Sequence, residues 1–147
     1  MRRTVLTVTL VATLISGCGG DKDAEFRKEY RPLNTQVKSL EGDVSRSISG
    51  ASGKSDRQIE SQFRGLSKRA AGLKKDVDAL EPPDELSPDA DNLVEAMGDA
   101  EVALRDIGKA AGDSDAPAAR RATIQLVAAS GSLRDSRRKL ERATQGG

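Results

Sequence analysis

Four segments of the chain carry apolar residues that alternate at spacings of four and three positions. These rows run from Phe26 to Ile48, from Ile59 to Leu80, from Leu86 to Ala111 and from Ala119 to Leu140. Spacings of four and three return a side chain to the same face of an α-helix, which has 3.6 residues per turn. No segment shows the two-residue alternation of a half-buried strand. The chain is therefore predicted to be all-α, with one apolar face on each helix.

Each apolar row is expected to be one seam of a shared core, packed as in a coiled coil. The third row has a second, parallel row of small residues beside it, Ala96, Ala103 and Ala110, which should let a neighbouring helix approach closely. The fourth row is the poorest. Ile124 and Val127 are expected to widen its apolar face, and Arg137 falls where an apolar residue would be expected.

Turn residues separate the four segments and suggest where each helix begins. The second helix should start near Asp56 or Ser55, and the third at Ser87, with Pro88 at its first helical position. Asp115 should cap the fourth helix. We expect helices over about 24–48, 56–80 and 116–142, with the third following Ser87. Pro32 lies inside the first and favours a kink over a fresh start, because the apolar row keeps its phase across it.

Short connections make consecutive helices antiparallel neighbours. The prediction is an up-down-up-down four-helix bundle over residues 24–142, followed by a frayed tail, 143–147. Two other arrangements fit the same pattern. Two helical hairpins would pair between chains in a dimer, or the chain would form a long, partly disordered coiled coil.

Composition argues against several classes of function. The chain has no histidine and no tryptophan, and its one cysteine is Cys18, so no catalytic residue and no cofactor are predicted. Lys and Arg number 24 and Asp and Glu 23, which leaves no basic field to attract nucleic acid. The carboxylates between Asp84 and Asp91 lack the loop spacing and the central glycine of an EF-hand, so no metal site is predicted.

The N-terminus has the three parts of an export signal. Arg2 and Arg3 are followed by an apolar stretch from Thr4 to Ile15, too short to cross a bilayer but long enough for a signal sequence. The stretch closes on Ile15-Ser16-Gly17-Cys18. An aliphatic residue and two small residues before a cysteine resemble the lipobox of bacterial lipoproteins.

This resemblance implies how the chain is processed and held. Residues 1–17 would be removed as a signal peptide, and Cys18 would carry a thioether-linked diacylglycerol and an acylated amino group. Several acyl chains anchor a protein stably, whereas one does so only marginally. The protein would lie outside the cytoplasm on the cell membrane. In a host with an outer membrane, Gly19 after the cysteine implies sorting to that membrane. Residues 18–23 should form the lipidated cysteine and a flexible tether.

Five cations gather near the end of the predicted fourth helix, namely Arg134, Arg137, Arg138, Lys139 and Arg142. One explanation is that they complement the negative end of the helix dipole. The other is that they form a basic patch facing anionic headgroups, because the predicted topology brings this end beside the lipid tether.

Two functions are compatible with these features. The first is a non-enzymatic binding or interaction module that holds a protein or peptide partner at the bacterial cell envelope. The alternative is a structural spacer or homo-oligomer without a dedicated ligand. Both keep the membrane as a partner through the lipid anchor and neither involves nucleic acid.

Overall fold

Four long α-helices make up most of residues 19–145, the part of the chain that the structure, a computed structural model, describes. They are α1 (Gly19–Ser49), α2 (Asp56–Asp78), α3 (Ser87–Gly112) and α4 (Ala116–Gln145), and a 3-10 turn, η1 (Ala51–Gly53), follows α1. No strand occurs within 19–145, and the predicted all-α class is confirmed. The predicted signal peptide and Cys18 lie outside the described residues.

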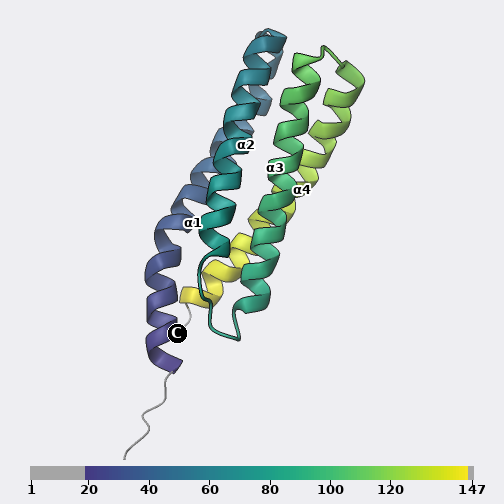
Figure 1. Cartoon of the computed structure of the whole chain (residues 1–147). Coiled ribbons are helices and arrows are strands. Elements are labelled where there is room, and N and C mark those ends of the chain that lie inside the picture. The colour runs from purple at the N-terminus through teal and green to yellow at the C-terminus, as the bar shows by residue number, and fades with distance from the viewer. Residues whose placement is uncertain (1–18, 146–147) are drawn as a thin grey trace, which may run out of the picture.

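The helices run up, down, up and down, so α1 begins and α4 ends at the same end of the bundle (Figure 1). The connection between α2 and α3 lies at this end too. The other two turns meet at the opposite end, where the Ser114 hydroxyl donates to Asp56 Oδ2 at 2.9 Å. This arrangement is the predicted four-helix bundle.

The first and the last helix each extend further toward the chain termini than the sequence predicted. α1 begins at Gly19, so the predicted tether over 19–23 is wrong for these five residues. α1 also continues through Pro32 without a fresh start. At the other end of the chain, α4 runs to Gln145, so residues 143–145 of the predicted frayed tail are helical.

Three local motifs set the inner helix ends. Ser55, rather than Asp56, caps α2 in a capping box with Gln58. Leu86, rather than Ser87, precedes α3, which shifts the predicted start by one residue and places Pro88 in the first turn. As predicted, Asp115 caps α4, since its Oδ1 accepts from the amide of Ala118 at 2.9 Å.

The turn between α3 and α4 ends α3 in a Schellman motif. The amide of Asp115 donates to the carbonyl of Ala110 at 2.8 Å, and that of Ser114 donates to Ala111 at 3.1 Å. Ser114 adopts the required left-handed conformation, with φ of 53°. This sharp reversal makes α3 and α4 antiparallel neighbours.

The core consists mainly of the predicted seam residues, and α3 lies at its centre. The row Ala96, Ala103 and Ala110 is buried, as predicted, and α3 packs closely against both α2 and α4. A Cβ at Gly108 would lie 3.3 Å from the backbone nitrogen of Arg64 and the backbone oxygen of Glu60, which shows how near α2 comes. α1 and α4 approach each other much less closely.

Two apolar residues are not where the pattern placed them. Ile124 and Val127, expected to widen the core face of α4, are 66% and 61% exposed. At 3.6 residues per turn, both side chains point away from the buried row of Leu126, Leu133 and Leu140, so the core does not cover them.

Candidate functional site

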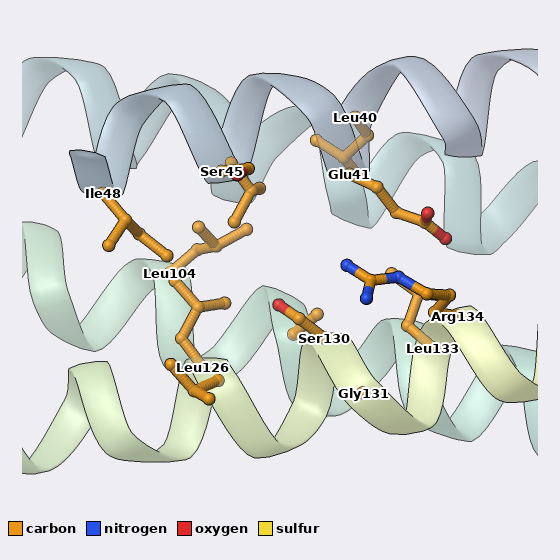
Figure 2. A pocket seen from close by; sticks show the side chains of 13 residues that line it. Leu40, Glu41, Ser45, Ile48, Leu104, Leu126, Ser130, Gly131, Leu133 and Arg134 are labelled. Carbon is orange, nitrogen blue, oxygen red and sulfur yellow. The ribbon is translucent and has the colours of Figure 1, made fainter. Parts of the chain in front are cut away.

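An open groove lies between α1 and α4 on the surface of the bundle. It has a volume of about 250 Å³ and it is mainly apolar. Figure 2 shows Leu104 of α3 rising into the space between Leu40 and Ile48 of α1 and Leu126 of α4. The groove is lined by Leu40, Glu41, Val44, Ser45, Ile48, Ala100, Leu104, Leu126, Val127, Ser130, Gly131, Leu133 and Arg134.

Small side chains on three helices keep the groove open. α4 contributes Ser130 and Gly131, α1 contributes Ser45, and α3 contributes Ala100. A Cβ at Gly131 would meet no atom within 4 Å. The deeper walls are large and fully covered, because Leu104 and Leu126 are completely buried. The groove is therefore a recess above a packed core and not a break in it.

One end of the groove is closed by a buried polar cluster that joins α1 to α4. Arg137 of α4 is 5% exposed. Its Nε donates to Glu41 Oε1 at 2.8 Å, and its Nη1 donates to Glu141 Oε2 at 2.9 Å and to Asn34 Oδ1 at 3.4 Å. Lys38 of α1 also pairs with Glu141. Charged hydrogen bonds thus hold the two helices where close packing does not.

The cluster changes the titration of its neighbours. The hydrogen bond from Lys38 lowers the pKa of Glu141 below its usual value, against the opposing effect of burial. Burial strongly raises the pKa of Tyr30, whose ring stacks on Phe26 with centroids 5.6 Å apart. Tyr30 therefore stays neutral while Glu141 remains a charged partner of Arg137.

Arg134 is the cation at the mouth of the groove. Figure 2 shows its guanidinium extending into the gap between the α1 and α4 ribbons. It is exposed, and it forms no ion pair within residues 19–145. Because Arg137 already binds the carboxylate of Glu41, the charge of Arg134 is available to a ligand.

The structure divides the predicted basic patch. Arg137 points into the bundle, so its assignment to a membrane-facing surface is wrong. Lys139 pairs with Asp89 of α3 at 2.6 Å, on the side of α4 away from α1. Arg134, Arg138 and Arg142 are exposed. The five residues therefore do not form one surface, because successive helix positions point in different directions.

Two other features bear on the site. No group of three or more acidic, cysteine or histidine side chains suited to a metal occurs within 19–145. Over the same range, none of the helices combines the length and the hydropathy that crossing a bilayer requires.

Comparison of the chain with protein-family models, with curated proteins and with solved structures finds no match. A function must therefore be argued from the groove and from the sequence of the first 18 residues. The apolar spacing did not predict the groove, because the distance between α1 and α4 depends on side chains from three helices.

Proposed function

We propose that this chain is a lipid-anchored protein of the bacterial cell envelope whose helical bundle is a non-enzymatic binding module. The α1–α4 groove is its binding site. The observation that carries this proposal is an apolar recess whose lining includes the exposed Val127, with the exposed Ile124 about one turn away along α4. Exposed apolar patches with a polar rim are typical of protein interaction sites.

The anchor is supported by the order of the N-terminal residues. Arg2-Arg3, the apolar stretch and Ile15-Ser16-Gly17-Cys18 follow one another as in a lipoprotein signal. α1 then begins directly after Cys18. A lipid on this residue would place the end of the bundle that holds both the start of α1 and the end of α4 next to the membrane, with the groove above it.

Binding rather than catalysis is supported by the groove's polar residues. They are Glu41, Ser45, Ser130 and Arg134. Neither serine has a base such as histidine beside it in the lining, and Glu41 is held by Arg137. Such groups suit recognition, in which apolar walls supply affinity and a few polar groups fix orientation.

Site-directed photo-crosslinking in whole cells tests this function. A benzophenone amino acid in place of Val127 should form a discrete covalent adduct with a protein partner. The same amino acid in place of Lys68, which is exposed on α2, is the matched control and should not. Gly131→Phe should abolish the Val127 adduct by filling the groove, while the fold tolerates the ring because nothing lies near that Cβ. An absent adduct, or the same adduct from both positions, would contradict the proposal.

A further inference from the structure

The outer face of α4 carries a second row of residues at coiled-coil spacing. Successive members lie four, three, four, three and four positions apart, and all are exposed. The row, called here the outer seam, consists of Arg120, Ile124, Val127, Gly131, Arg134 and Arg138. The core-facing seam of α4 already binds the rest of the bundle, so the outer seam has no partner within 19–145. Seams with this spacing are the surfaces on which helices pack against helices.

The charges of the outer seam are all positive. None of Arg120, Arg134 and Arg138 forms an ion pair within the described residues. Glu41, the one carboxylate in the groove lining, does not neutralise them, because Arg137 binds it. An occupant with carboxylates would therefore gain charged hydrogen bonds, in which arginine binds a carboxylate in a fixed, two-pronged geometry.

The middle of the outer seam is shaped for close approach. Ile124 and Val127 project into solvent, and Gly131 leaves an open space where a side chain would stand. Behind these residues the groove provides a recess for the side chains of an occupant. A helix that lies on the outer seam would bury both apolar side chains and fill the recess.

We propose that the occupant is an acidic amphipathic helix of a partner protein, which lies along α4 with its apolar side chains in the α1–α4 groove. This inference rests on the proposed function and identifies the chemical class of the partner. A second copy of the chain fits poorly, because an antiparallel pair of outer seams would place Arg120 of each copy near Arg138 of the other. A flat bilayer fits poorly too, since it would touch the ridge of α4 but leave the recess unfilled.

Peptide binding to the purified full-length chain tests the proposal. The probe is a labelled helical peptide of about 20 residues with leucines at alternating four- and three-residue spacings and glutamates beside them. A second peptide has lysine in place of every glutamate. Fluorescence anisotropy should show binding of the acidic peptide, weakened by salt, and little binding of the lysine peptide.

Reversing the charge of the three arginines of the outer seam is the most direct test. The variant Arg120→Glu/Arg134→Glu/Arg138→Glu should bind the acidic peptide at least about tenfold more weakly and bind the lysine peptide instead. The matched control is Arg57→Glu/Lys68→Glu/Lys75→Glu, which changes the net charge equally at three exposed positions of α2. It should bind the acidic peptide like the unmodified chain. Because none of the six residues forms an ion pair within residues 19–145, both variants should keep the wild-type thermal melt.

Several outcomes would overturn the proposal. These are equal binding of the two peptides, equal loss of binding in both triple variants, and a dimer in solution that disappears in Ile124→Ser/Val127→Ser. Binding to phosphatidylglycerol-containing vesicles but to neither peptide would also overturn it and indicate a lipid surface. If the peptides fail while the Val127 photo-adduct persists, the binding module stands and the acidic helix is wrong.

Discussion

The guanidinium of Arg137 joins groups from both helices that flank the groove. Replacing it with alanine would leave the largely covered carboxylates of Glu41 and Glu141 without their shared cation. Removing one member of a buried ion pair costs about 3–5 kcal/mol. We expect Arg137→Ala to lower the free energy of unfolding by about 3 kcal/mol, measured by urea denaturation. Arg138→Ala, at an exposed neighbour, is the control and should change it little. Equal effects of the two substitutions would show that the cluster does not hold α1 to α4.

The same cluster predicts a dependence of stability on acid. The pKa of Glu141 is lowered in the folded chain, first by the hydrogen bond from Lys38. Its stabilising contribution is therefore complete above the unfolded pKa and is lost as the pH falls through the folded pKa. The urea midpoint should drop as the pH falls below the ordinary pKa of a glutamate, and Glu141→Gln should make that drop shallower. Glu85→Gln, at an exposed residue, should follow the unmodified chain. Parallel curves for both variants would contradict the prediction.

Single residues show where reading the sequence succeeds and fails. The spacing correctly places Leu126, Leu133 and Leu140 in the core of α4. It also marks Arg137 as a core-facing position. Spacing cannot predict the hydrogen-bond partners of Arg137, because Asn34 and Glu41 lie about a hundred positions earlier in the chain. The prediction for Ile124 and Val127 failed for a different reason, because their spacing from Leu126 already turns them away from the core face.

At the scale of the helices, the glycines of α2 and α3 differ in whether a neighbouring helix lies close to them. A Cβ at Gly65 or Gly72 of α2 would meet no atom within 4 Å, whereas at Gly108 of α3 it would press on the backbone of α2. Gly65→Ala and Gly72→Ala should each raise the free energy of unfolding by about 1 kcal/mol. Gly108→Ala should be less stable than Gly72→Ala, as measured by chemical denaturation. Equal gains at all three positions would mean that α2 and α3 are not in tight contact.

Helix interiors could be predicted from the sequence better than helix ends. The buried rows of α2 and α3 match the predicted seams, because burial on one face imposes a period of 3.6 residues. The start of α1 and the end of α4 have no such constraint. Gly19 and Gly20 look like a tether, yet the helix extends through them. The cap of α2 was ambiguous in the sequence because Ser55 and Asp56 are both good capping residues.

At the scale of the whole molecule, the groove follows from the difference between two kinds of helix contact. Alanines let α3 lie close to its neighbours, whereas α1 meets α4 through a polar cluster, and small side chains beside the cluster leave the groove open. No single segment encodes that difference. The outer seam of α4 was the available signal, since Arg120, Ile124, Val127, Gly131, Arg134 and Arg138 share one spacing.

The proposed lipid anchor can be tested separately from the groove. Cys18→Ser should abolish labelling with palmitate and release the protein from the membrane fraction, because the thiol is the proposed site of lipid attachment. Ser16→Ala keeps a small residue before the cysteine and is the control, so it should still be labelled. Palmitate labelling of Cys18→Ser would rule out the lipoprotein assignment.

Cysteine labelling in intact cells tests the central claim, an external binding module with an occupied groove, in one measurement. Cys18 is the chain's one cysteine, and the proposed lipid on it would leave no free thiol, so Val127→Cys and Lys68→Cys would each supply the only reactive one. We predict that a membrane-impermeant maleimide labels Lys68→Cys equally fast in cells and after purification. Val127→Cys should react much more slowly in cells than after purification, because the partner covers it.

Equal labelling rates for Val127→Cys in cells and after purification would contradict the occupied groove. No labelling of either variant in cells would contradict the external location.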